Sequence, residues 1–216
     1  MSKKILIAFI ILFGLYYVFF LSHIAESLIL IFKVIPMLLI FILAATSKNL
    51  GIKKYQLLIV IGLVFCMVGD YTLQWFLIGL TSFLIGHIFY ILAFSSTNER
   101  QVPAWAKIVL LVYGASMAVW IAGTVFSSGE VVLGIAVIAY ISVILMMGWT
   151  AIRTGSTLAT IGALLFISSD SYLAINKFVM PLPCSHEIIM LTYYSAQILI
   201  ALSISQYSEI RSKVLQ

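Results

Sequence analysis

Long apolar runs, separated by short polar breaks, follow one another along the whole chain. Each run has about 17–25 residues, the length that a helix needs to cross about 30 Å of hydrocarbon. The breaks carry turn and charge signals, as in "SKNLGIKK" at 47–54 and "SSTNERQVP" at 95–103. The pattern predicts eight transmembrane helices, at Lys4–Leu21, Ser27–Ala45, Gln56–Trp75, Leu77–Phe94, Ala104–Phe126, Val131–Ile152, Thr157–Phe178 and His186–Gln206.

The breaks leave no room for a soluble domain, because none is longer than ten residues. We therefore expect residues 1–216 to form a single, all-α transmembrane domain of eight helices. The composition agrees, with 63% hydrophobic residues, 9% charged residues and a mean hydropathy of +1.19. The first run follows two lysines, as in a signal peptide, but it is long and no A-x-A cleavage site follows it, so we expect it to be a span.

The lysine and arginine side chains gather on one side of the predicted bundle. Of the twelve, Lys33 lies within a span and Lys177 lies on the opposite side. Because cytoplasmic loops retain cations, this bias predicts that both termini are cytoplasmic. Topology then explains the net charge of +5, and we expect no nucleic-acid partner. The ten cations on the side of the termini are Lys3, Lys4, Lys48, Lys53, Lys54, Arg100, Lys107, Arg153, Arg211 and Lys213.

Two aspartates interrupt the apolar runs. Asp70, in "FCMVGDYTL", lies about 8 Å below the outer end of its predicted helix, and Asp170, in "FISSDSYLA", about 12 Å below. A charged group at the centre of a helix costs at least about 2.5–3.5 kcal/mol, so such residues usually face the bundle interior and one another. Five more polar residues lie at similar depth or near the middle of the membrane: Lys33, His87, Tyr193, Tyr194 and Gln197.

A simpler interpretation is open for several of these residues. Polar side chains in membrane helices often do no more than hydrogen-bond a neighbouring helix, which suits the tyrosines, Gln197 and His87. The long side chain of Lys33 can also extend to the lipid headgroups. Residues that only join helices are not expected to share one layer, so the sequence favours a functional role for Asp70 and Asp170 most strongly.

The spacing around the two aspartates hints at a repeat. Gly62, Asp70 and Leu73 follow the pattern G-x7-D-x2-L, and the same spacing recurs at residues 162, 170 and 173 in a helix of the same direction. A parallel duplication of four plus four helices would give this pattern and would place the two acids opposite each other. We state this repeat as a hypothesis.

Two facing carboxyl groups in a site of low polarity should not both be ionised, which leaves an acid beside a base. Such a pair suits hydrolysis through an oxocarbenium-like cation, and it also suits a proton relay in a transporter. We expect no metal, because no His, Asp or Glu ligand set occurs at helical spacing. Cys66 lies in a span and Cys184 in an outer break, so no disulfide is expected either.

The sequence resembles the YhhN-type lysoplasmalogenases, which are eight-span membrane proteins. Five blocks in the order of that family carry the resemblance. Cys66 departs from the family pattern, which often has Ser at this position, and so a hydroxyl there is in doubt as a required group. The blocks are "KVIP" (33–36), "GLVFCMVGDYTL" (62–73), "GLTSFLIGHIFYILAF" (79–94), "GALLFISSDSYLAINKF" (162–178) and "YYSAQILI" (193–200).

The resemblance implies hydrolysis of the vinyl-ether bond of a lysoplasmalogen to a fatty aldehyde and a glycerophospho-base, with ethanolamine or choline as the base. It implies Asp70 and Asp170 as the acid and base, in either order, and no cofactor. His87 would move or orient a proton, and Lys33 would bind the lipid phosphate or tune an acid. The remaining candidates would position substrate and water, or support those that do: Tyr193, Tyr194, Gln197, Ser169, Asn176 and Tyr90.

The partners expected on this basis are a lysophospholipid substrate and membrane lipid, in the inner membrane if the source is bacterial. The sequence indicates no oligomeric state. The main alternative is a proton-coupled, multi-pass transporter that uses the same aspartate pair. A third alternative is an intramembrane interaction protein without turnover.

Overall fold

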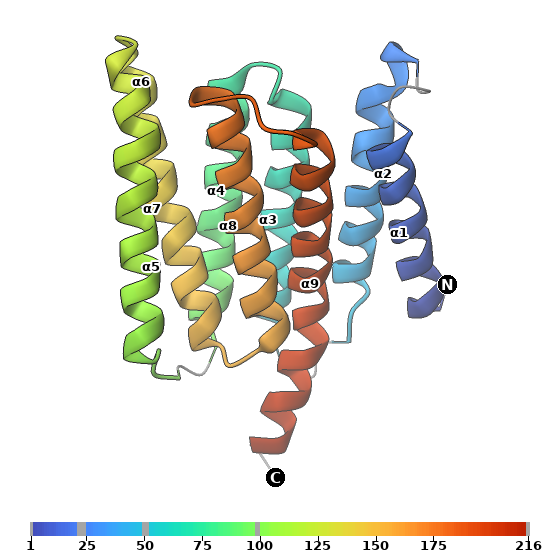
Figure 1. Ribbon diagram of the computed structural model, residues 1–216. Helices are drawn as coiled ribbons and strands as arrows, with labels where there is room; N and C mark the ends of the chain where they lie inside the picture. The colour runs from blue at the N-terminus through green and yellow to red at the C-terminus, as the bar shows by residue number, and fades with distance from the viewer. Residues whose placement is uncertain (1, 21–24, 49–51, 98–99, 215–216) are drawn as a thin grey trace.

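The computed structural model describes residues 2–20, 25–48, 52–97 and 100–214, except for the side chains of residues 26–27 and 211–214. The described residues form helices joined by short turns, with no strand among them (Figure 1). The elements are α1 (Lys3–Phe19), α2 (Glu26–Ala45), α3 (Lys53–Thr72), α4 (Phe76–Ser95), α5 (Ala104–Met117), η2 (Ala118–Ala122), α6 (Gly123–Ser127), α7 (Val131–Arg153), α8 (Thr157–Phe178) and α9 (Ser185–Val214).

Each predicted apolar run overlaps a helix in the part of the chain that the structure describes, although α3 begins and ends three residues earlier than the predicted Gln56–Trp75. Seven of these helices are long and apolar enough to cross a membrane. The other, α1, has 17 residues and ends at Phe19, and its predicted end at Leu21 lies outside the described residues. The chain is therefore an all-α, multi-pass membrane protein.

Two helices differ from the prediction in form. The fifth run is continuous from Ala104 to Ser127, but η2 in its middle is a π-helical turn. Such turns interrupt the regular hydrogen-bond ladder, and they are frequent at functional sites. The last helix continues past the predicted end at Gln206 as far as Val214, and its final turns project beyond the other helices (Figure 1).

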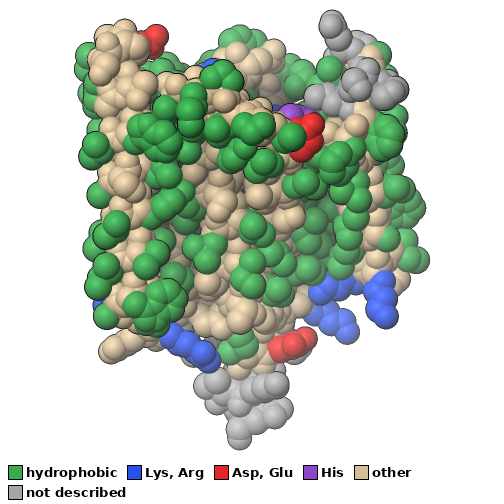
Figure 2. Space-filling model, viewed as in Figure 1, with side chains coloured by type: hydrophobic (Ala, Val, Ile, Leu, Met, Phe, Trp, Pro, Cys, Tyr) green, Lys and Arg blue, Asp and Glu red, His purple; other side chains and the backbone are tan. Residues whose placement is uncertain are grey.

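The outer surface of the bundle has an apolar belt and a cationic end (Figure 2). Hydrophobic side chains cover the visible flank, and Lys and Arg side chains lie towards the end where α1 begins and α9 ends. Lys3 donates a hydrogen bond to Ser205 at 3.2 Å, which holds the beginning of α1 against this part of α9. The side chains of Arg211 and Lys213 lie outside the described residues. The cations described at this end are Lys3, Lys4, Lys48, Lys53, Lys54, Arg100, Lys107 and Arg153.

Glycines let two pairs of helices approach closely. A Cβ on Gly62 of α3 would lie 2.4 Å from the Tyr90 ring and 3.1 Å from the Gly86 carbonyl oxygen of α4. A Cβ on Gly162 of α8 would lie 3.0 Å from the carbonyl oxygen of Ala196 in α9. Small residues at such crossings bring backbones together in membranes. The two aspartates stand eight residues after these glycines, on α3 and α8.

We expect Gly62→Ala to lower the free energy of unfolding by about 1–3 kcal/mol, the usual cost of overpacking. The Tyr90 ring is fully buried and cannot move aside freely. Gly123→Ala is the matched control, because its Cβ would meet no atom within 4 Å. Thermal unfolding in detergent measures both variants, and equal midpoints would contradict close packing at Gly62.

Candidate functional site

Both aspartates line one cavity of about 90 Å³ inside the bundle. Most of its wall is apolar, including Leu80, Phe83 and Ile167. Ligand sites typically combine such a wall with a few placed polar groups. The polar side chains in the lining come from α2, α3, α5, α7, α8 and α9, and they are Lys33, Asp70, Tyr113, Tyr140, Ser169, Asp170, Ser171 and Tyr193.

Asp70 is held from two sides. The Lys33 ammonium lies 3.2 Å from Asp70 Oδ1 and also donates to the Asp70 backbone oxygen at 3.2 Å. The Tyr193 hydroxyl donates to Asp70 Oδ2 at 2.6 Å. The side chain of Lys33 is only 12% exposed and that of Asp70 only 3%. Lys33 therefore does not extend to the headgroups, and its charge stabilises Asp70 as a carboxylate.

The backbone around Lys33 is also fixed. Pro36, one turn further along α2, lacks an N–H and so removes a donor from the helical ladder. In the same turn, the Tyr194 hydroxyl donates to the Lys33 carbonyl at 2.8 Å. Tyr194 does not line the cavity itself. Its place is behind Lys33, where it joins α9 to α2.

Asp170 has a different environment from that of Asp70. The Tyr140 hydroxyl donates a short hydrogen bond to Asp170 Oδ2, and no ion pair is formed with Asp170 among the described residues. In the same part of the lining, Tyr113 donates to Ser171 at 2.6 Å. The two carboxyl groups thus share a cavity, and each accepts a hydrogen bond from a tyrosine, but only Asp70 also faces an ammonium.

Tyr140 is not among the residues predicted from the sequence, although its depth in α7 matches that of Asp170 in α8. Tyr140 lies nine residues after the start of α7 and Asp170 eight residues before the end of α8. At 1.5 Å per residue, both depths are about 12–14 Å from the same end of the bundle. Tyrosines are enriched at membrane interfaces, and hydropathy does not distinguish such a tyrosine from one that lies deeper in its helix, as Tyr140 does.

His87 lies behind the cavity wall and does not line it. Its ring is completely buried and contacts the rings of Phe166, Tyr140 and Tyr90, with the Phe166 centroid at 4.5 Å. Neither ring nitrogen hydrogen-bonds to another protein group. The structure therefore places His87 against Tyr140, which is the partner of Asp170, and gives it no contact with a carboxyl group.

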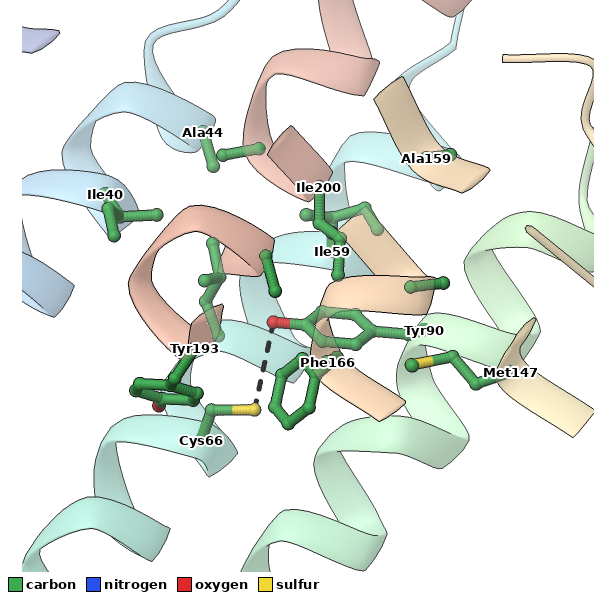
Figure 3. Close-up of a cluster of buried hydrophobic side chains, with 14 of the residues drawn as sticks. Ile40, Ala44, Ile59, Cys66, Tyr90, Met147, Ala159, Phe166, Tyr193 and Ile200 are labelled. Atoms are coloured by element: carbon green, nitrogen blue, oxygen red, sulfur yellow. Dashed lines mark hydrogen bonds between the residues drawn. The ribbon is translucent and has the colours of Figure 1, made fainter. Parts of the chain in front are cut away.

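A second polar layer lies deeper in the core, among apolar side chains (Figure 3). Tyr90 donates to Gln197 Oε1 at 2.6 Å, and Cys66 Sγ lies 3.8 Å from the Tyr90 hydroxyl. All three side chains are fully buried, and Tyr90 and Gln197 are absent from the cavity lining. This layer joins α3, α4 and α9 beneath the site.

The other two predicted residues lie at different places. Ser169 lines the cavity and donates to the Ile189 carbonyl oxygen at 3.0 Å, which joins α8 to α9. Asn176 lies outside the lining, and its side-chain oxygen accepts a hydrogen bond from the Leu182 N–H at 2.8 Å. Asn176 thus holds the connection between α8 and α9. Of the ten predicted residues, the structure gathers five around the cavity: Lys33, Asp70, Ser169, Asp170 and Tyr193.

Comparison with known proteins gives this site a family context. The chain is 37% identical over 147 residues to Lysoplasmalogenase TMEM86B of Sus scrofa, which is 67% of this chain and 62% of that protein. It is 36% identical over 160 residues to Lysoplasmalogenase TMEM86A of Homo sapiens, which is 67% of this chain and 64% of that protein. The chain thus spans a little under two thirds of the length of these relatives. No solved structure matches it.

The match to a protein-family model covers most of the chain. The model of the YhhN family matches residues 28–204, a range that contains every residue of the cavity lining. The family resemblance expected from the five sequence blocks is thereby confirmed. The chain belongs to the YhhN family.

Proposed function

We propose that this protein is a membrane hydrolase that cleaves the vinyl-ether bond of a lysoplasmalogen, giving a fatty aldehyde and a glycerophospho-base. The observation that carries the proposal is the shared cavity, where one carboxyl group has an ammonium partner and the other has none. The names of the relatives in the same family support this substrate class. The cavity supplies the acid, the base and the apolar wall that such chemistry needs.

We assign the general acid to Asp170 and the general base to Asp70. A carboxyl group in an apolar cavity keeps its proton more readily when no cation lies beside it, as is the case for Asp170. Asp70, paired with Lys33 at 3.2 Å, stays a carboxylate and can accept a proton from water. The sequence leaves open which aspartate is the acid and which is the base. We base the assignment on the different partners of the two side chains.

The reaction then begins with two proton transfers and ends with collapse of a hemiacetal. Asp170 gives a proton to the alkenyl carbon that is second from the ether oxygen, and the π pair of the double bond forms the new C–H bond. A lone pair of the ether oxygen then stabilises the electron-poor first carbon as an oxocarbenium ion. Water adds to the cationic carbon and loses a proton to Asp70. The resulting hemiacetal collapses as its hydroxyl loses a proton and the departing glycerol oxygen gains one, which gives the aldehyde and the free glycerol hydroxyl of the second product. Passage of the proton held by Asp70 back to Asp170 resets the pair. No oxidant, nucleotide or metal is needed for this balance.

The remaining residues support these two acids. Tyr140 orients Asp170 by its hydrogen bond, and His87 packs against Tyr140. Tyr193 orients Asp70. Because the Lys33 ammonium is already paired with Asp70, we assign Lys33 to tuning that acid and not to the lipid phosphate.

We further propose that the whole bundle is a duplicated, eight-span unit with both termini in the cytoplasm. The cationic end supports this orientation, since cations are retained on the cytoplasmic side. The duplication is supported by the two glycine crossings, where Gly62 meets the carbonyl of Gly86 and Gly162 meets that of Ala196. In this orientation the cavity lies in the outer half of the membrane.

Mass spectrometry of the purified protein with a lysoplasmalogen and with an ester-linked lysolipid of equal chain length tests the function. We expect fatty aldehyde from the first lipid only. Absence of product from both lipids would overturn the proposal and would favour proton-coupled transport, which flux measurements in liposomes would then detect.

A further inference from the structure

A second hollow, of about 560 Å³, opens at the end of the bundle opposite the cationic end. It lies where α4 and α7 begin and α8 ends, and these three places lie together in Figure 1. We call it the distal hollow. Its lining combines a cation, an anion and an exposed tryptophan with apolar residues: Trp75, Phe76, Leu77, Ile78, Glu130, Leu133, Lys177 and Phe178.

The two charges of the distal hollow do not neutralise each other. No ion pair joins Lys177 and Glu130 in the described residues. The Lys177 ammonium instead lies 4.5 Å from the centroid of the Phe76 ring. The side chains of Lys177, Glu130 and Trp75 are all exposed, so each can meet a ligand. Lys177 is also the cation that the sequence places on the side opposite to the ten others. It has no role in the proposed chemistry.

The distal hollow adjoins the cavity that holds the aspartates. Phe76 and Phe178 line both spaces, and their rings meet edge to face with centroids 5.3 Å apart. Asp170 and Lys177 are two helical turns apart on one face of α8, a separation of about 10 Å along the axis. Ala174, between them on the same face, lines the cavity and leaves space beside the helix. The segment from the phosphate through the three glycerol carbons and the ether oxygen to the alkenyl carbon, together with the reach of the lysine side chain, can bridge this distance.

We propose that the distal hollow binds the zwitterionic headgroup of the lysolipid, with Lys177 on the phosphate and with Glu130 and Trp75 on the amine. This inference rests on the proposed function and adds a headgroup site to it. An ammonium is a standard partner for phosphate, and a hollow that contains both a carboxylate and an aromatic face suits a cationic amine. With the headgroup there, the glycerol passes the two phenylalanines and the ether carbon reaches Asp170.

Binding of three saturated alkyl-ether lipids tests this site, since none of them has the vinyl ether and none is hydrolysed. The first is an alkyl glycerol, the second carries a phosphate, and the third carries phosphoethanolamine. We expect Lys177→Gln to weaken binding of the second and third lipids by about tenfold, as for loss of a charge-assisted hydrogen bond. We expect Glu130→Gln to weaken binding of the third lipid only. Neither variant should alter binding of the alkyl glycerol.

Lys107→Gln is the matched control, because Lys107 is an exposed lysine at the cationic end, 5.5 Å from the Trp149 ring. It should leave all three affinities unchanged. Two results would overturn the site. One is that Lys177→Gln weakens binding of all three lipids equally, and the other is that the wild-type protein binds all three with the same affinity. The expected pattern without aldehyde release from a lysoplasmalogen would support the headgroup site and overturn only the proposed function. Aldehyde release without headgroup dependence would do the reverse.

Discussion

Asp170→Asn is expected to lower the turnover of a lysoplasmalogen at least about 100-fold, the low end of general acid catalysis. The amide has the size of the carboxyl group, and its oxygen can still accept the hydrogen bond from Tyr140. It has no proton to give to the alkenyl carbon. The fold and the affinity for lipid should therefore persist while the chemical step is lost, which steady-state kinetics together with equilibrium binding would measure.

Ser168→Ala on the same helix is the control for this variant. The Ser168 side chain is exposed and donates only to the Leu164 carbonyl oxygen of its own helix, at 2.9 Å. The Ser168→Ala variant should therefore keep wild-type turnover. Near-normal turnover of Asp170→Asn in the same assay would remove Asp170 from the mechanism.

Lys33→Met is expected to destabilise the protein by about 3–5 kcal/mol, the usual effect of removing one partner of a buried ion pair. The change leaves the Asp70 carboxylate, which is 3% exposed, without its cation. Asp70→Asn in the same chain should restore most of the lost stability, because the amide carries no charge. Unfolding by heat or denaturant in detergent would measure the single and double variants.

Lys54→Met controls for the loss of a lysine, since Lys54 is exposed at the start of α3. Its unfolding midpoint should match that of the wild type. If Lys33→Met also left the midpoint unchanged and instead weakened lipid binding, Lys33 would be a phosphate ligand and not the counter-ion of Asp70.

The sequence predicts the helices of the fold where the length of an apolar run is enough to identify a membrane span. Runs such as Val131–Ile152 predict α7 closely, because a helix is the structure that satisfies every backbone group in hydrocarbon. Local interruptions are not visible in the same pattern. The π-helical turn at Ala118–Ala122 consists of apolar residues only, and their hydropathy gives no reason for a break at this place.

The charged residues of the candidate site could be predicted, because a charge within a membrane span is costly. That rule finds Lys33, Asp70 and Asp170, and the structure gathers all three around one cavity. Partners could not be predicted, because depth along a helix says nothing of the direction in which a side chain points. His87 and Tyr140 have similar depths, yet only Tyr140 lines the cavity.

The central claim is that hydrolysis begins with protonation of the alkenyl carbon and that water then adds to the oxocarbenium carbon. Hydrolysis of a lysoplasmalogen in water enriched in deuterium and heavy oxygen, with mass spectrometry of both products, tests it most directly. The account predicts a fatty aldehyde with one deuterium on the carbon next to the carbonyl and a glycerophospho-base without heavy oxygen. Heavy oxygen in the glycerophospho-base would show cleavage on the glycerol side of the ether and would contradict the account.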